Sequence, residues 1–341
     1  MIGIRKVVVG SVVAAILVAL FTPLNSAQAL MVWVLNEDAV TMNITGVSPH
    51  VERTGSVDRI WYPTLAGTIV ADCTEAGECS TIPGTGRLGS DFTAVTLPNG
   101  TRRAYFVNPN PGASTKSVFS AECSTSECLS VGTSILTTSA LTVPSSGSAW
   151  GVPESVITPD GKVRLYVVES PVVGNCTEKL ASYISSDGIS FTKESGWRFE
   201  DGFSTDPEIL RAKNGDWLMI MAANCRDSER VSKLYLATSS DGLTWSTPQK
   251  LTGSDISRID PTGYEVSSDV FRIYYTTLTS LEPVDKTITI RRATLKFQST
   301  TSEPSITSGS KSKTSITCVK GKITKKVSAI SPKCPKGYRT K

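Results

Sequence analysis

Acidic side chains recur at two fixed positions of a repeated segment. Four copies of this segment align along the chain, and each combines an entry pair, an alternating stretch, a turn and a β-rich apolar stretch. Residues two apart on a β-strand point to the same face, so acids at the first and third positions would converge if the copies pack around one centre. The first positions are Asp91, Val152, Asp206 and Asp260, and the third positions are Thr93, Glu154, Glu208 and Thr262.

Converging carboxylates can cleave a glycosidic bond, one acting as general acid and the other as base or nucleophile. Crowding and burial raise the pKa of at least one such group, which suits an acid at neutral pH. We therefore predict Asp91, Glu154, Asp206 and Glu208 as catalytic residues. The rival interpretation is that each acid bonds nearby backbone N–H groups and only stabilises the entry to its strand.

Three aromatic residues could supply a stacking face for a sugar ring. Trp150 precedes the acid in the sequence Trp-Gly-Val-Pro-Glu154, and Trp61 and Tyr62 form an adjacent pair. We predict Trp61, Tyr62 and Trp150 as substrate-binding residues, together with Asp260.

Composition excludes several other chemistries. His50 is the single histidine, and it lies in a segment flanked by Pro, Gly and Thr that we expect to be structural or exposed to solvent. A Ser-His-Asp mechanism would have to use it, and a zinc site is disfavoured because the chain has no Cys-x-x-Cys pair. We predict neither a metal nor a cofactor.

The repeat predicts the elements that would position these acids. The four copies begin 61, 54 and 54 residues apart, and each supplies about four strands. Such a repeat is typical of a β-propeller blade, so we predict an all-β, five-bladed β-propeller of four-stranded blades, with one strand of the segment 31–88 closing the ring. Hairpin turns are indicated at Asn99-Gly100, Asp160-Gly161 and Asn214-Gly215.

The repeated Asp-Pro, Pro-Asp-Gly and Tyr-Tyr pattern resembles the five-bladed propeller glycosidases of family 43 and their fructan-cleaving relatives in family 32. That resemblance implies an Asp base or nucleophile at Asp91 and a second acidic residue at Glu154, where Gly-Val replaces the usual Ala. It implies the acid at Glu208, although the usual Glu-Gly-Pro context is missing there.

Two Ser-Ser-Asp-Gly-x-x-aromatic turns resemble shortened sialidase Asp boxes, which implies structural roles for Asp187 and Asp241. A sialidase-like enzyme is therefore an alternative. It would need three arginines in its site, and Arg59 is an approximate counterpart of only the first of them.

The N-terminus has the layout of a secretory signal peptide. Arg5 and Lys6 precede an apolar run over 7–21, and small residues follow at Ala27 and Ala29. We predict a signal peptide over 1–29 and a secreted, extracellular protein. An even count of eight cysteines in an exported chain indicates disulfides. The spacing favours the pairs Cys73–Cys79, Cys123–Cys128, Cys176–Cys225 and Cys318–Cys334.

Basic charge is concentrated at the C-terminus. We predict a propeller domain over 30–298, a Ser/Thr-rich linker over 299–315 and a basic disulfide-closed tail over 316–341, which resembles a motif that ends many secreted bacterial proteins. Outside the tail and the first residues, 23 basic residues face 31 acidic ones, which argues against nucleic-acid binding. The tail would attract anionic cell-wall polymers or phospholipid headgroups, or it could be a solvated terminus.

These patterns predict a secreted glycoside hydrolase-like propeller that acts on an extracellular poly- or oligosaccharide through axial carboxylates. The alternative from a different class is a non-catalytic propeller at the cell surface that binds a glycan or a protein partner. We expect a monomer associated with the cell wall through its tail.

Overall fold

The computed structural model divides the chain into two compact units, 33–298 and a unit formed by 1–32 with 299–341. The predicted signal peptide over 1–29 lies outside the residues that the structure describes. These residues are 30–64, 67–83, 89–107, 115–132, 135–136, 142–144, 151–169, 178–202, 204–223, 231–253, 255–279, 288–300, 314–329 and 332–341.

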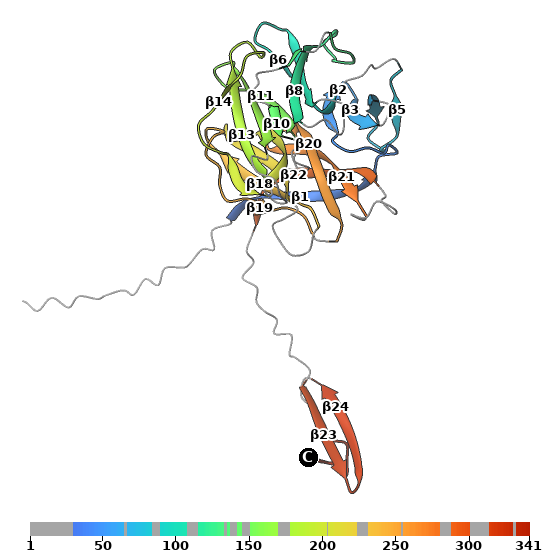
Figure 1. The fold of residues 1–341 in the computed structure, drawn as a ribbon. Coiled ribbons are helices and arrows are strands. Elements are labelled where there is room, and N and C mark those ends of the chain that lie inside the picture. The colour runs from blue at the N-terminus through green and yellow to red at the C-terminus, as the bar shows by residue number, and fades with distance from the viewer. Residues whose placement is uncertain are drawn as a thin grey trace, which may run out of the picture. The chain divides into compact units, whose positions relative to one another are not determined.

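Five antiparallel sheets form the larger unit, which confirms the expected all-β fold of four-stranded sheets. Two of the sheets carry one additional short strand, which the sequence pattern did not predict. We number the sheets 1 to 5 in chain order (Figure 1). Sheet 1 contains β2 (His50–Thr54), β3 (Val57–Thr64), β4 (Gly67–Cys73) and β5 (Cys79–Thr81); sheet 2 contains β6 (Ser90–Thr96), β7 (Arg102–Val107), β8 (Thr115–Glu122), β10 (Thr142–Pro144) and the added β9 (Ile135–Leu136).

Sheets 3 to 5 repeat this order, with the first strand of each sheet at one edge. Sheet 3 contains β11 (Gly151–Ile157), β12 (Val163–Glu169), β13 (Glu178–Ser185), β14 (Thr192–Lys193) and the added β15 (Phe199–Gly202). Sheet 4 contains β16 (Ser204–Arg211), β17 (Trp217–Ala223), β18 (Lys233–Ser239) and β19 (Gln249–Lys250); sheet 5 contains β20 (Ser257–Ser267), β21 (Val270–Leu278), β22 (Ile288–Thr300) and β1 (Leu30–Thr41).

The N-terminal strand β1 is the outer strand of the last sheet. It pairs with β22, so a segment from the start of the described chain completes sheet 5, as expected (Figure 1, where blue β1 lies among orange strands). The first strands of successive sheets contact each other in chain order, and β20 of sheet 5 also contacts β2 of sheet 1.

Apolar side chains fill the space between each pair of neighbouring sheets. The central strand β17 is buried along its whole length because its two faces pack against different neighbours. Buried strands with two covered faces read as continuous hydrophobic runs rather than alternating ones. Five separate clusters lie between sheets 1 and 2, 2 and 3, 3 and 4, 4 and 5, and 5 and 1.

Polar turns fasten neighbouring sheets at their edges. After β18, the Asp241 carboxylate accepts hydrogen bonds from the backbone N–H groups of Leu243 (2.7 Å) and Thr244 (2.8 Å). These N–H groups favour the charged carboxylate and lower the pKa of Asp241 to about 2. These hydrogen bonds within the turn fix its backbone independently of its contacts with sheet 3.

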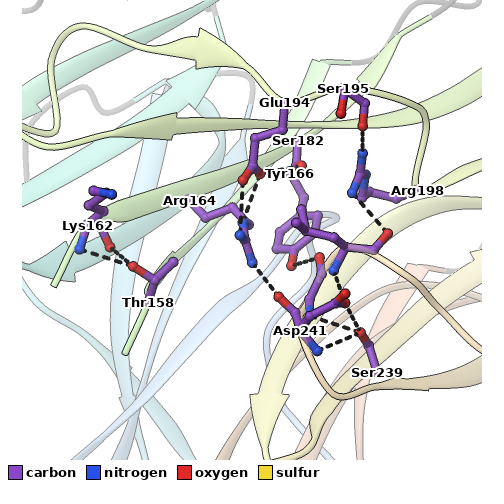
Figure 2. Close-up of polar contacts among 12 residues, drawn as sticks. Thr158, Lys162, Arg164, Tyr166, Ser182, Glu194, Ser195, Arg198, Ser239 and Asp241 are labelled. Atoms are coloured by element: carbon purple, nitrogen blue, oxygen red, sulfur yellow. Dashed lines mark hydrogen bonds and ion pairs between the residues drawn. The ribbon is translucent and has the colours of Figure 1, made fainter. Parts of the chain in front are cut away.

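Two side chains of sheet 3 donate hydrogen bonds to this turn. The Tyr166 hydroxyl donates to the Gly242 carbonyl (2.7 Å), and Arg164 Nη1 donates to the Asp241 carbonyl (3.0 Å). Figure 2 shows Arg164 between Asp241 and Glu194, whose carboxylate it binds through Nε and Nη2 (2.8 and 3.0 Å). The same arrangement joins sheets 2 and 3, where the Tyr105 hydroxyl donates to the Gly188 carbonyl (2.8 Å).

Two of the expected disulfides close short loops in the larger unit, Cys73–Cys79 and Cys123–Cys128, and both are confirmed. Cys176 and Cys225 lie outside the described residues. No helix among the described residues is long and apolar enough to cross a membrane.

The C-terminal unit is a small antiparallel sheet. Its strands are β23 (Thr314–Lys320), β24 (Ile323–Ala329) and β25 (Arg339–Thr340), in the order β24-β23-β25. The expected disulfide Cys318–Cys334 is confirmed and ties β23 to the segment that precedes β25.

We expect Tyr166→Phe to lower the free energy of unfolding by about 1–2 kcal/mol, because the buried Gly242 carbonyl loses its hydroxyl donor. Denaturant unfolding measures the change. Ser240→Ala is the matched control, since it removes an exposed hydroxyl from the same turn and should leave stability unchanged. Equal stability of the Tyr166→Phe and Ser240→Ala variants would contradict the proposed fastening role.

Candidate active site

The first strands of all five sheets line one pocket. It contains about 350 Å³ of space not filled by atoms and is open to solvent. Each sheet contributes a short segment, at or just before its first strand, that begins at the first position of the repeat. The segments are Ser48-Pro49-His50, Asp91-Phe92, Val152-Pro153-Glu154, Asp206-Pro207-Glu208 and Asp260-Pro261-Thr262, with Thr93 buried behind Phe92.

The backbone adopts the same unusual conformation at the start of each segment. Five non-glycine residues in the left-handed region mark equivalent positions, and a non-glycine residue there is uncommon and costs about 1–3 kcal/mol. The ladder to the second strand shifts register next to four of them, so a β-bulge turns the following side chains toward the pocket. The residues and their φ angles are Ser48 (44°), Asp91 (51°), Val152 (31°), Asp206 (51°) and Asp260 (51°).

Three first-position acids, Asp91, Asp206 and Asp260, lie partly exposed around the pocket, and we call them the rim acids. Asp260 accepts a hydrogen bond from the Ser48 backbone N–H (2.7 Å), which links sheet 5 to sheet 1. Asp206 accepts one from the Asp260 backbone N–H, which links sheets 4 and 5.

Burial and neighbouring negative charges raise the pKa values of two rim acids. Burial, followed by the charge of Asp91, raises the pKa of Asp206 to about 6. Burial and the charge of Asp206 raise the pKa of Asp260 well above its ordinary value. The carboxyls of Asp206 and Asp260 also share a hydrogen bond, which requires a proton on one of them.

Two third-position acids, Glu154 and Glu208, are more deeply buried, with 9% and 5% of their surface exposed, and we call them the inner acids. Burial raises the pKa of Glu154 to about 8, although hydrogen bonds from Thr93 and the Ser155 backbone oppose the shift. Burial and the charge of Glu154 raise the pKa of Glu208 well above its usual range. A pKa near 8 favours the protonated form of Glu154 at neutral pH, so this side chain can act as a proton donor.

The third-position threonines complete the ring by linking sheets. Thr93 Oγ1 accepts from the Ser155 backbone N–H (3.3 Å) and lies 2.9 Å from Ser155 Oγ. Thr262 Oγ1 accepts from the Val51 backbone N–H (3.1 Å). The third position thus carries both inter-sheet hydrogen bonds and the inner acids.

No lysine or arginine is among the residues that line this pocket in the described part of the chain. In the whole described part of the chain, no group of three or more His, Cys, Asp or Glu side chains is arranged to hold a metal ion.

Two of the three predicted aromatic residues, Trp61 and Tyr62, do not line the pocket. Trp61 is 1% exposed, stacks on Phe92 and donates its indole N–H to the Cys128 carbonyl (3.1 Å). Tyr62 is 6% exposed and packs in the cluster between sheets 5 and 1. Their side chains fill the core because β3 is a central strand, so they offer no open face to a sugar. Trp150 lies outside the described residues.

His50 and the segment around it correct the sequence analysis. We expected a structural or solvent-exposed loop, but Ser48-Pro49-His50 is the fifth copy of the repeated segment and lines the pocket. His50 lies edge-on to Phe92, and its Nε2 is 3.2 Å from Glu52 Oε1. Two sequence features could have identified this copy of the repeat. One is Ser-Pro-His in place of Asp-Pro-Glu, and the other is the strand that follows it. They were missed because Ser replaces Asp and the spacing to Asp91 is 43 residues.

The arginine that partly matched a sialidase site lies elsewhere. Arg59 is 6% exposed, donates to both carboxylate oxygens of Asp72 (2.7 and 2.9 Å) and lies 3.0 Å from Glu127. Its guanidinium is paired with Asp72 and Glu127, and Arg59 is not among the residues that line the pocket.

The fold is shared with carbohydrate-active enzymes. The structure is similar to the endo-arabinase from Bacteroides thetaiotaomicron (TM-score 0.55, 12% identity, 78% of this chain and 99% of that chain covered). It is similar to a thermostable family-43 glycoside hydrolase (0.52, 15%, 90% and 100%). It is also similar to an N-acetylgalactosamine deacetylase from F. plautii in complex with blood group B trisaccharide (0.52, 13%, 76% and 95%).

The glycoside hydrolases among these structures are five-bladed β-propellers, and this chain has a fold of that propeller type. No protein-family model matches the sequence, and no curated protein sequence matches it.

The raised pKa values predict a pH dependence of stability. Asp206 and Glu154 bind protons more tightly in the folded chain than in the unfolded chain. Their contribution to stability is therefore complete below their ordinary pKa values. It is lost as pH rises through about 6 for Asp206 and about 8 for Glu154.

We expect Glu154→Gln to raise the melting temperature by about 2 °C or more at about pH 8 and to change it little at about pH 4. Calorimetry at several pH values tests this. Glu265→Gln is the control, since Glu265 lies on β20 and is exposed outside the pocket. Parallel pH curves for wild type and Glu154→Gln would contradict the raised pKa.

Proposed function

We propose that the five sheets are the blades of a closed five-bladed β-propeller, and that this protein is a secreted glycoside hydrolase that acts on an extracellular glycan through the axial acids. The observation that carries this proposal is the convergence of five acids, Asp91, Glu154, Asp206, Glu208 and Asp260, in one pocket without a lysine or arginine in its lining. The contact between β20 and β2 and the cluster between sheets 5 and 1 support ring closure.

The electrostatics support a division of roles. Glycoside hydrolysis needs a protonated acid and an ionised carboxylate on the two sides of the scissile bond. Glu154, with its pKa near 8, is the proposed proton donor, with Glu208 sharing this role because the two inner acids repel each other's charge. Asp91 is the proposed base or nucleophile, since its negative charge opposes ionisation of Asp206 and Asp260.

The similar structures support a carbohydrate substrate. An endo-arabinase and a family-43 glycoside hydrolase share the fold over their full lengths. The deacetylase shows that the same fold carries other chemistry on glycans. Function resides in the site rather than the fold, so the acids carry the assignment to hydrolysis.

A second candidate function is a non-catalytic propeller that binds a glycan or a protein partner at the cell surface. It is favoured by one observation, that Asp206 and Asp260 each accept a backbone N–H from a neighbouring sheet. Under this alternative the rim acids serve only to join sheets. Retained glycan binding without turnover would select it.

Export is proposed on the signal-peptide pattern over 1–29 and on the disulfides, which persist in oxidising compartments. The protein is proposed to act as a monomer.

We expect wild-type protein to hydrolyse at least one member of a panel of arabinan, xylan, fructan and sialosides. On that substrate Glu154→Gln should lower kcat by about 100-fold or more, because a general acid contributes about 10²–10⁴ to rate. Reducing-sugar release measures this, and Glu265→Gln should retain full activity. A folded Glu154→Gln variant with wild-type kcat would remove Glu154 from the mechanism.

A further inference from the structure

The C-terminal segment 314–341 carries positive charge without any acidic residue to balance it. Between 314 and 341 the chain has no Asp or Glu. None of the basic side chains in this segment can therefore form an ion pair with an acidic side chain of the same segment. The basic residues are Lys320, Lys322, Lys325, Lys326, Lys333, Lys336, Arg339 and Lys341.

These charges sit on a folded scaffold rather than on a loose tail. β23 pairs with β24 along its whole length and with β25 at Cys318 and Val319. The Cys318–Cys334 disulfide and a hydrogen bond from the Lys341 backbone N–H to the Thr317 carbonyl (2.9 Å) hold the C-terminal segment against β23. Such preorganisation reduces the entropy lost on binding.

The charge surrounds the sheet instead of covering one face. Lys325 is paired with Cys318 and Lys326 with Thr317, and adjacent positions on a strand point to opposite faces. Arg339 is paired with Val319, so it shares the face of Lys326, while Lys320 shares the face of Lys325. Lys322, in the β23–β24 turn, and Lys326 are exposed.

We propose that the β23–β25 sheet is a docking site for a linear, phosphate-bearing anionic polymer. A flexible polyanion can follow basic residues around both faces and release its condensed counterions as it binds. A flat membrane surface would meet only one side of the sheet. Membrane-surface segments also present an apolar face, whereas Ile323 is the single large hydrophobic residue found exposed in the described part of 314–341 (60%).

The proposal is independent of glycan hydrolysis, because it concerns binding by another unit of the chain. Docking there would hold the propeller near a polymer-rich surface and raise the local concentration of the pocket around its substrate. The two activities can fail separately, since one is read as binding and the other as turnover.

The test uses the whole mature chain and long-chain inorganic polyphosphate as the probe. We expect the Lys322, Lys325 and Lys326→Gln triple variant to bind at least about 10-fold more weakly than wild type, with a shallower salt dependence of the association constant. The same three lysines changed to Arg should keep the affinity, which separates loss of charge from loss of fold. Fluorescence anisotropy over a range of NaCl concentrations measures both quantities.

The matched control is a triple variant in the propeller unit that removes the same amount of charge. It changes three exposed residues, Lys213→Gln, Arg291→Gln and Lys296→Gln. We expect it to bind polyphosphate within about twofold of wild type. Equal weakening in both triple variants would overturn the proposal, because attraction would then come from overall charge. Absence of polyphosphate binding by wild type would overturn it as well.

Vesicles of phosphatidylglycerol and phosphatidylcholine test the membrane alternative. Ile323→Ser should leave polyphosphate binding unchanged, since a phosphate polymer gains nothing from the exposed isoleucine. Tighter binding to these vesicles than to polyphosphate, weakened by Ile323→Ser, would replace the polymer with a lipid surface and overturn the proposal.

Discussion

The structure depends on one constraint, that each sheet of the larger unit must bury both of its faces. Strand β17 shows this in its simplest form, since every residue from Trp217 to Ala223 is buried, one face against sheet 3 and the other against sheet 5. A sheet with two apolar faces needs a neighbour on each side. Five such sheets in succession satisfy this need when the last also packs against the first, as the cluster between sheets 5 and 1 does.

This packing has an electrostatic consequence at the centre. The first strands of neighbouring sheets contact one another, and their entry residues lie together at one pocket. Acids at those positions lose water and meet like charges, and both effects raise pKa values. Crowding these acids costs free energy. Apolar burial elsewhere in the sheets offsets this cost, and N–H donors such as the Ser48 backbone reduce it. Proton-carrying acids are thus a product of the architecture.

Much of this arrangement could be predicted from the sequence, because it follows from local rules. The Asn-Gly and Asp-Gly turns and the spacing of 54–61 residues revealed the repeat. The repeat placed Asp91, Asp206 and Asp260 at its first position and Glu154 and Glu208 at its third. What escaped prediction depends on tertiary context. Trp61 and Tyr62 form an adjacent aromatic pair in the sequence, yet their strand is central and buries both. His50 was missed because its copy of the repeat has a different spacing and lacks the first-position acid.

Glycosidic cleavage by these acids requires that one carboxyl of the pocket keep its proton at neutral pH. A pH titration of the side-chain carboxyl signals by carbon-13 NMR tests it most directly, with Glu154→Gln assigning the Glu154 resonance. The account predicts a midpoint for Glu154 near its pKa of about 8. A midpoint close to the ordinary glutamate value of about 4.3 would contradict it, because the acids would then be hydrated and apart.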